Sequence, residues 1–244
     1  MFNIKEKVAI VTGGASGIGR ATVEAIIAKG GSPIIADWNE ELGRKVAAEL
    51  NVPFFKVDVS NEEQVKNLVE EAVKLYGHLD IMVNNAGISE QIIFHEVETD
   101  VYRRMMSVNQ DGVYFGCKYA IRQFLNQETP GVIANVSSMM GIVGNVQSPF
   151  YCMAKTGLRG FSKSLALRYG SKGIRANTVH PGYIETGLID EKEVGKETID
   201  YLGSITPVGR IGQPEEIAHA IIFMIENEFL TGAEIVVDGG FTVQ

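Results

Sequence analysis

Short apolar runs alternate with longer amphipathic stretches along the whole chain. The short runs are almost continuous in apolar and β-branched residues, as is typical of parallel strands buried on both faces. They predict strands at residues 8–11, 33–36, 54–57, 79–83, 132–136, 175–179 and 234–237. The longer stretches predict helices at residues 21–28, 40–50, 64–76, 101–124, 151–169 and 214–224. Strands and helices therefore alternate from one end of the chain to the other.

This alternation predicts an α/β fold in which right-handed crossovers return each strand parallel to the previous one. We expect a single Rossmann-type doubly wound domain over residues 1–244, with a seven-stranded parallel sheet in the order 3-2-1-4-5-6-7 and helices on both faces. Neither a linker nor a low-complexity tract nor a repeat divides the chain. Residues 187–208 are the long stretch without a firm assignment.

Two predicted helices carry their own start signals. Ser60 and Glu63 fit a capping box, in which a hydroxyl and a carboxylate satisfy free amides of the first turn. Pro214 stands at a first helical position, and two acids follow it near the positive end of the helix dipole. Both signals agree with the helices that the periodicity predicts.

Composition and charge narrow the class of protein. The formal net charge is −8 and Arg103-Arg104 is the longest basic cluster, so we expect no nucleic-acid partner. Cys117 and Cys152 fit neither a zinc pattern nor a redox pair, so we expect no metal. No apolar run approaches the ~18 residues of a membrane span, and the first residues do not resemble a signal peptide. We expect a cytoplasmic protein without a membrane partner.

A glycine-rich turn joins the first predicted strand to the first predicted helix. Glycines there permit a tight turn and let backbone amides approach a pyrophosphate at the helix N-terminus. The turn predicts dinucleotide contacts at Gly13, Ser16, Gly17, Ile18 and Gly19.

Asp37 ends the second predicted strand, eighteen residues beyond Gly19. A carboxylate there accepts hydrogen bonds from an adenosine ribose and repels a 2′-phosphate. The glycine loop carries Ser16 rather than a basic residue, and Trp38 stands where a phosphate binder would place Arg. These features favour NAD over NADP. The alternative is that Asp37 caps the helix that starts near Asn39.

Two further strand ends offer dinucleotide contacts. Asp58, after the third strand, is placed to bond an adenine amino group, and Val59 to contact the ring, although Asp58 also fits as an acid at a helix N-terminus. Asn85, Ala86 and Gly87 follow the fourth strand at the carboxyl edge of the sheet, where ligands collect. Asn and Gly are also ordinary turn residues, so this segment counts only in combination.

Tyr151 and Lys155 have the chemistry of a general acid/base. Their i, i+4 spacing puts them on one face of a predicted helix. Free tyrosine has a pKa near ~10, and a nearby ammonium lowers it. Ser138, thirteen residues before Tyr151, can orient a substrate oxygen. Asn109 interrupts a long helical pattern and is suited to hold a water that links Lys155 to solvent.

Six segments in this order and spacing resemble the short-chain dehydrogenase/reductase family, over nearly all of the chain. They are TGGASGIG at 12–19, NNAG at 84–87, the segment around Asn109, Ser138, YCMAK at 151–155 and Pro181-Gly182. The resemblance implies that Tyr151 exchanges a proton with the carbinol oxygen while hydride moves to or from a nicotinamide. It implies that Lys155 bonds the nicotinamide ribose and lowers the Tyr151 pKa, that Ser138 positions the substrate oxygen, and that Asn109 supports a proton relay.

The resemblance also implies further contacts and an assembly. Pro181, Gly182, Ile184 and Thr186 would lie at the nicotinamide, together with Tyr151 and Lys155. A homotetramer is implied, with residues 236–240 near a subunit contact.

A substrate pocket is expected beside Ser138, covered by residues 187–208. Its candidate wall residues are Met139, Met140, Val143, Asn145, Phe150, Tyr183 and Leu188. Such a largely apolar wall suits a secondary alcohol or ketone, for example a hydroxysteroid, a diol or a cyclic alcohol. We therefore predict an NAD-dependent alcohol dehydrogenase/ketone reductase with a small-molecule substrate. The alternatives are an NADPH-dependent 3-oxoacyl thioester reductase and a non-catalytic dinucleotide-binding regulator.

Overall fold

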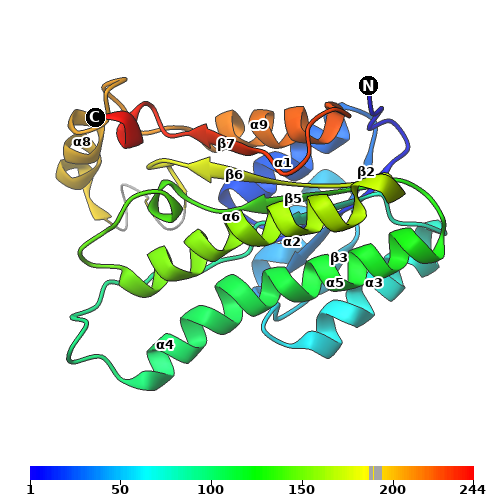
Figure 1. Cartoon of the computed structure of the whole chain (residues 1–244), viewed down its shortest axis with the longest axis horizontal. Helices are drawn as coiled ribbons and strands as arrows, with labels where there is room; N and C mark the ends of the chain where they lie inside the picture. Colours follow the sequence, from blue (N-terminus) through cyan, green and yellow to red (C-terminus); the bar gives the residue numbers. More distant parts are fainter. Residues whose placement is uncertain (187–188, 190–193) are drawn as a thin grey trace.

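The sheet has the predicted topology. The computed structural model describes residues 1–186, 189 and 194–244, and within them seven strands form one sheet in the order β3-β2-β1-β4-β5-β6-β7 (Figure 1). Each neighbouring pair of strands is parallel. The strands are β1 (Val8–Thr12), β2 (Ser32–Asp37), β3 (Phe54–Lys56), β4 (Ile81–Asn84), β5 (Gly131–Val136), β6 (Ile174–Pro181) and β7 (Glu234–Val237).

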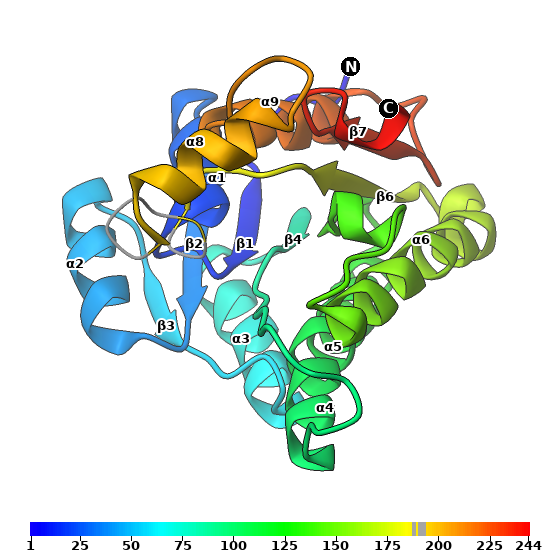
Figure 2. The same cartoon turned by 90° about the vertical axis from the view of Figure 1, so that its left-hand side faces the viewer.

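Helices cover both faces of this sheet. They are α1 (Gly17–Ala28), α2 (Glu40–Leu50), α3 (Glu62–Tyr76), α4 (Thr99–Met106), α5 (Gly112–Asn126), α6 (Pro149–Tyr169), α8 (Lys196–Ser204) and α9 (Pro214–Glu226). Figure 2 shows α1 and α9 on one side of the sheet, and α3, α5 and α6 on the other. Each face buries its own apolar cluster, which explains why the strand sequences are apolar without alternation.

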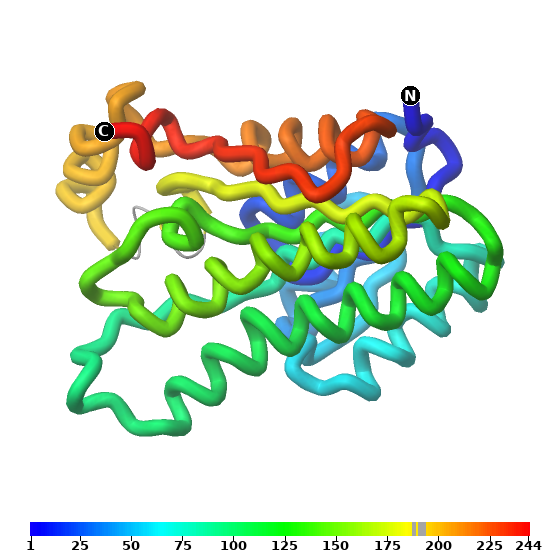
Figure 3. The backbone as a smooth tube through the Cα atoms, in the orientation of Figure 1, coloured from blue at the N-terminus to red at the C-terminus, as the bar shows by residue number. Residues whose placement is uncertain are grey.

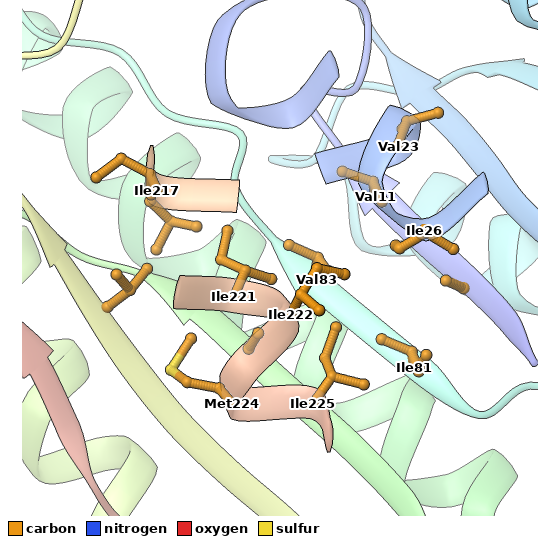
Figure 4. Close-up of a cluster of buried hydrophobic side chains, with 14 of the residues drawn as sticks. Val11, Val23, Ile26, Ile81, Val83, Ile217, Ile221, Ile222, Met224 and Ile225 are labelled. Carbon is orange, nitrogen blue, oxygen red and sulfur yellow. The ribbon is translucent and has the colours of Figure 1, made fainter. Parts of the chain in front are cut away.

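The α9 face shows how the packing follows from the sequence. Ile217, Ile221 and Ile225 recur every four residues, so they line one side of the helix, and each is 0% exposed. Figure 4 shows this side facing Ile81 and Val83 of β4. Burying one isoleucine side chain contributes about 1.5–3 kcal/mol, so the stripe anchors α9 to the sheet.

The helix starts differ in detail from the prediction. The capping box at Ser60 is wrong, because Asn61 caps α3 by accepting from the amide of Gln64. The Ser60 hydroxyl instead donates to Asp58 Oδ1 at 2.7 Å. The start signal of α9 is confirmed: Pro214 is its first residue, and Gln213 N donates to the Glu216 carboxylate at 2.8 Å in a capping box.

The single helix predicted for residues 101–124 is interrupted. Helix α4 runs directly into a π-helical turn at Ser107–Asp111, which runs into α5. Such turns insert one residue into a helix and are frequent at functional sites. Asn109, the residue that signals the interruption in the sequence, lies inside the turn and is fully buried.

The end of the sheet that carries the strand carboxyl ends lies on the left of Figure 1. The starts of α4 and α6 gather there, together with α8, which occupies part of the stretch left unassigned by the sequence. The backbone trace of Figure 3 shows the two termini at opposite ends of the long axis. Among the described residues, no helix is both long and apolar enough to cross a membrane.

Candidate active site

Three of the residues predicted for catalysis meet at the carboxyl edge of the sheet. Ser138 follows β5 as the N-cap of a short 3-10 turn, and Tyr151 and Lys155 stand in the first turns of α6. The Tyr151 phenol lies within hydrogen-bonding reach of the Ser138 hydroxyl. The Lys155 ammonium lies 5.5 Å from the centre of the Tyr151 ring. The structure therefore brings a hydroxyl, a phenol and an ammonium to one point.

Burial dominates the ionisation of this pair. Desolvation raises the pKa of the Tyr151 phenol to about 12, although the hydrogen bond with Ser138 acts to lower it. Burial also lowers the pKa of Lys155, which is 2% exposed, to about 8. The lowered Tyr151 pKa that the sequence predicts is therefore not produced by the protein alone, because the loss of hydration outweighs the hydrogen bond with Ser138.

Lys155 is oriented by the last carbonyl of β5. Its ammonium donates to the Val136 oxygen at 2.9 Å. An ammonium carries three protons, so this bond sets the direction of the group without exhausting its donors. The side chain can therefore reach a second acceptor, such as a ribose hydroxyl, from a fixed position.

Asn109 is held rigidly by the chain around it. Its Oδ1 accepts from the amide of Ile88 at 3.2 Å, and its Nδ2 donates to the carbonyls of Ile88 at 2.8 Å and Met105 at 3.0 Å. A Cβ placed on Gly87 would lie 2.7 Å from Asn109 Oδ1 and 3.3 Å from Lys155 Nζ. The bare Cα of Gly87 therefore lets the two side chains approach the same small region.

The glycine loop fits a dinucleotide pyrophosphate. Gly13 and Gly17 have φ values of +64° and +50°, a region that favours glycine. A Cβ on Gly19 would lie 2.0 Å from the Gly13 oxygen, so the loop can fold this tightly only without side chains there. The Ser16 side chain makes no capping hydrogen bond to α1, and the first turn of α1 carries no acid. The N-terminal amides of α1, including that of Ile18, are thus available to an anion.

Thr12 locks this loop to the segment after β4, a role that the sequence analysis missed. Its hydroxyl accepts from the amides of Asn85 at 3.0 Å and Ala86 at 3.1 Å. The Asn85 side chain returns the contact by donating to the carbonyls of Thr12 at 3.0 Å and Gly13 at 3.2 Å. The side chain of Asn85, expected to touch the dinucleotide, is therefore engaged in shaping the glycine loop.

Asp37 lies beside the glycine loop with its carboxylate buried. Oδ2 accepts from the amide of Ala15 at 3.1 Å, and Oδ1 accepts from the amide of Asn39 at 3.0 Å. Helix α2 is capped by Asn39, whose side chain accepts from Leu42 N. The alternative role of Asp37 as the cap of α2 is thus filled by another residue. Trp38 beside it is 76% exposed.

Asp58 and Val59 lie at the end of the neighbouring strand β3. Asp58 is exposed, and its Oδ1 accepts from both the amide and the hydroxyl of Ser60. Val59 is buried against Gly112, where an added Cβ would come within 2.8 Å of the valine. Both residues border the edge of the sheet next to Asp37, as the expected adenine contacts require.

The segment after β6 returns to the glycine loop. Pro181 ends β6, and Gly182 packs on Asp238, where a Cβ would lie 2.7 Å from the Asp238 Cα. Ile184 is 5% exposed. A Cβ on Gly17 would lie 3.0 Å from the Thr186 side chain. The residues expected at the nicotinamide and at the pyrophosphate are therefore neighbours in the fold.

The predicted substrate wall is only partly available as surface. Met139 is 2% exposed, so its side chain belongs to the interior rather than to an open wall. Met140, Val143, Asn145, Phe150 and Tyr183 are partly exposed. Leu188 lies outside the described residues, as do residues 187 and 190–193 of the expected covering segment.

Aromatic contacts that the sequence analysis missed surround two of these wall residues. The Phe150 ring packs edge-on against Tyr102 of α4, with centroids 5.0 Å apart, and against Phe94, at 5.8 Å. The Tyr183 ring packs against Phe241 at 5.3 Å. Both predicted wall residues therefore pack against other aromatic rings.

Comparison with known proteins agrees with this geometry. The family described as "Enoyl-(Acyl carrier protein) reductase" matches residues 13–242. The NADP-dependent (R)-specific alcohol dehydrogenase of Lentilactobacillus kefiri is 38% identical, over 99% of this chain and 98% of that protein. The 2,5-dichloro-2,5-cyclohexadiene-1,4-diol dehydrogenase of Sphingobium indicum is 37% identical, over 99% of each chain.

A solved structure has nearly the same backbone fold as this chain. The crystal structure of gox2181 superposes with a TM-score of 0.93 at 35% sequence identity and covers 98% of this chain and 97% of that chain. Similarity of sequence and backbone over this length shows that the chain belongs to the short-chain dehydrogenase/reductase family, whose members bind a nicotinamide dinucleotide.

Proposed function

We propose that this protein is an NAD(H)-dependent oxidoreductase that interconverts a secondary alcohol and a ketone. The observation that carries the proposal is the meeting of Ser138, Tyr151 and Lys155 at the carboxyl edge of the sheet. A phenol that hydrogen-bonds a serine hydroxyl beside an oriented ammonium is suited to move a proton at a carbinol oxygen.

Each residue of the site has a distinct task in this proposal. A bound nicotinamide would supply or accept the hydride. Tyr151 takes the hydroxyl proton in alcohol oxidation and returns it in ketone reduction. Ser138 hydrogen-bonds the same oxygen and holds it against the phenol. Lys155, directed by the Val136 carbonyl, bonds the ribose and favours the phenolate, and Asn109 holds the water through which Lys155 exchanges protons with solvent.

The dinucleotide is proposed to lie along the carboxyl edge of the sheet. The amides at Ser16, Gly17, Ile18 and Gly19 hold its pyrophosphate, and Gly13, whose own amide donates to the Ala36 oxygen at 2.8 Å, shapes the turn beneath it. Its adenosine half contacts Asp37, Trp38, Asp58 and Val59, and its nicotinamide half contacts Asn85, Ala86, Gly87, Pro181, Gly182, Ile184 and Thr186. The φ values of the glycine loop and the uncapped start of α1 support this arrangement.

NAD is preferred to NADP in this proposal because of Asp37. Its carboxylate is anchored to the loop through Ala15, so a 2′-phosphate on the adenosine ribose would meet a fixed negative charge. Ser16 and Trp38 add no cation to offset that charge. The relative from Lentilactobacillus kefiri is named as NADP-dependent, so this preference has to be measured on the present protein.

The substrate is proposed to be a moderately apolar secondary alcohol, with cyclic alcohols and diols as the first choice. Phe150 and the rings around it form an aromatic mouth, and the relative from Sphingobium indicum is named for a cyclic diol. Apolar walls with few polar anchors bind such molecules mainly by burying their rings.

The decisive experiment is a nicotinamide absorbance assay over cyclic alcohols, diols, hydroxysteroids and 3-oxoacyl thioesters, each with NAD(H) and NADP(H). We expect the highest kcat/KM for a cyclic or steroidal alcohol with NAD. The Ser138→Ala variant should lose about 10²–10³-fold in kcat, since it removes one of the groups that hold the reacting oxygen. Highest activity with NADPH and a 3-oxoacyl thioester would instead establish the thioester reductase.

A homotetramer is proposed as the assembled state. Leu167 on α6 is 88% exposed and Val236 on β7 is 44% exposed. The side chains of Arg159 and Glu234 join these two elements. Together α6 and β7 present apolar surface that a second copy of the chain would cover. Light scattering after size exclusion tests this, and a monomer at working concentration would exclude it.

A further inference from the structure

His180 is a buried histidine that the proposed chemistry does not use. It lies in β6 and is 0% exposed, and its Nδ1 is 3.0 Å from the backbone oxygen of Ser138. A carbonyl oxygen can only accept a hydrogen bond, so Nδ1 carries the proton. The ring therefore donates to the chain at the very residue whose hydroxyl meets Tyr151.

The other side of the ring faces an ion-pair cluster. His180 Nε2 lies 3.5 Å from Glu234 Oε2 and makes no hydrogen bond within the described residues. Glu234 accepts from Arg159 Nε at 2.6 Å and also pairs with Lys163. Burial lowers the pKa of His180 below its ordinary value, and Arg159 and Lys163 act in the same direction. The hydrogen bond with the Ser138 backbone and the charge of Glu234 oppose this shift without reversing it. The ring is therefore neutral at neutral pH, with its proton on Nδ1.

The same cluster holds the other end of the turn that carries Ser138. The 3-10 turn after β5 runs from Met139 to Gly141. Arg159 Nη1 donates to the Gly141 oxygen at 3.2 Å. The Ser138 carbonyl at the start of the turn accepts from the Gly141 amide at 2.9 Å and, from outside the turn, from His180. Arg159 holds the carbonyl at the end of the turn. Within the turn, the Ser138 hydroxyl accepts from the Met140 amide at 3.1 Å, so its direction depends on the turn geometry.

We infer that His180 is a positioning residue, which aims the Ser138 hydroxyl at the substrate oxygen by holding the Ser138 carbonyl through Nδ1–H. The inference rests on the proposed function, in which Ser138 binds that oxygen. His180 touches neither substrate nor coenzyme in this assignment. Its effect is on the angle and distance of a single hydrogen bond, to which turnover is sensitive because small misplacements of reacting groups slow catalysis strongly.

Two substitutions separate the hydrogen bond from the bulk of the ring. His180→Leu fills the site without a donor, whereas the side-chain amide of His180→Asn offers an N–H near the position of Nδ1. We expect His180→Leu to lower kcat about 10- to 100-fold with an unchanged Kd for NADH, measured by fluorescence. His180→Asn should recover most of that kcat, while the two variants share a similar melting temperature. Equal kcat in the Leu variant and the unaltered protein, or equal loss in both variants, would overturn the inference.

A third variant covers the case in which His180→Leu does not fold. The longer amide of His180→Gln reaches the Nε2 position instead and leaves the Ser138 carbonyl with the Gly141 amide as its donor but without the bond from the side chain at position 180. The Asn variant should therefore turn over faster than the Gln variant, and equal rates would reject the assignment. Ser138→Ala separates the proposed role of Ser138 from the positioning role of His180. Full activity in Ser138→Ala would defeat the proposed role of Ser138 and this inference with it, whereas a slow Ser138→Ala beside a normal His180→Leu would defeat the positioning role alone.

Discussion

The ammonium of Lys155 lies 5.5 Å from the centre of the Tyr151 ring while it donates to the Val136 carbonyl at 2.9 Å. Both side chains are on one face of α6, and burial shifts both pKa values toward the neutral form: up to about 12 for the phenol and down to about 8 for the ammonium. Both groups are therefore harder to ionise here than in water, and an additional positive charge in the site would favour the phenolate of Tyr151. An oxidised nicotinamide carries such a charge.

Removing the phenol oxygen should stop turnover and spare coenzyme binding. Tyr151→Phe keeps the ring and removes the proton carrier, so we expect kcat to fall about 10²–10⁴-fold with an unchanged Kd for NADH. Fluorescence titration and steady-state kinetics measure the two quantities. Tyr76→Phe, at the end of α3 next to the amino edge of the sheet, is the matched control and should leave both unchanged. A large loss of NADH affinity in Tyr151→Phe would assign the phenol to binding instead.

Alcohol oxidation should accelerate from neutral to alkaline pH, because in the proposed mechanism Tyr151 acts as the base. Burial raises the pKa of this phenol to about 12 from its ordinary value of 10.0. The positive charge of bound NAD acts in the opposite direction. We therefore expect ultraviolet titration of the protein alone to place this phenol above 10, and kcat/KM at saturating NAD to give a lower apparent pKa. Ketone reduction, which needs the protonated phenol, should slow over the same range. Equal pKa values in the two measurements would contradict the assignment.

Lys155→Met should raise the stability of the protein without coenzyme while abolishing activity. Burial lowers the pKa of Lys155 from its ordinary 10.5 to about 8, which at about 1.4 kcal/mol per pKa unit limits the gain to about 3 kcal/mol. Below pH 8 the lysine is charged in both states and the penalty is complete.

The pH dependence of that gain has a definite sign. Between pH 8 and 10.5 the unfolded chain binds more protons than the folded one, so the unaltered protein gains stability as pH rises. The difference between the variant and the unaltered protein, followed by thermal unfolding, should therefore be largest below pH 8 and shrink toward pH 10.5. A difference that grows over this range would be inconsistent with a buried ammonium.

Substitution of Asp37 should relax coenzyme choice. Asp37→Ala removes the proposed ribose acceptor and also deprives the amides of Ala15 and Asn39 of the carboxylate that accepts from them. We expect the Kd of NAD to rise about 10- to 100-fold, the range for losing a hydrogen bond to a charged group. Asp37→Asn keeps an acceptor oxygen and removes only the charge, so it should mainly improve NADP binding. Isothermal titration compares the two, and a preference of the unaltered protein for NADP would refute the coenzyme assignment.

A methyl group on Gly87 should disrupt the relay. Gly87 is not among the glycines with positive φ, so alanine is compatible with its backbone, yet the new Cβ would lie 2.7 Å from Asn109 Oδ1 and 3.3 Å from Lys155 Nζ. We expect kcat to fall about 10²-fold. Gly160→Ala in α6, where a Cβ has nothing within 4 Å, should keep full activity and gain about 0.5–1 kcal/mol of stability. Normal kinetics in Gly87→Ala would show that the relay passes elsewhere.

The sequence pattern predicts the interruptions and ends of helices and strands less well than it predicts their existence. The apolar run predicted for residues 79–83 becomes a strand at Ile81–Asn84. The residue before it, Asp80, is buried and accepts from Lys7 and from the amide of Val8. The break at Asn109 is visible in the sequence, but its form as a π-helical turn depends on Ile88, twenty-one positions away, whose backbone holds the asparagine. In each case the partner comes from another part of the fold.

The sequence by itself determined the alternation of strands and helices and the parallel sheet with its predicted order, and it predicted which residues form the site. It could do so because hydrophobic periodicity and motif spacing are local properties of the chain. Tertiary structure alone decided what those residues do to one another. Two hydrogen bonds join groups far apart in sequence, one between Thr12 and Asn85 and one from His180 to Ser138. The raised pKa of Tyr151 depends on the exclusion of water around the phenol. Burial and contact are properties of the packed chain, which no stretch of residues possesses before it folds.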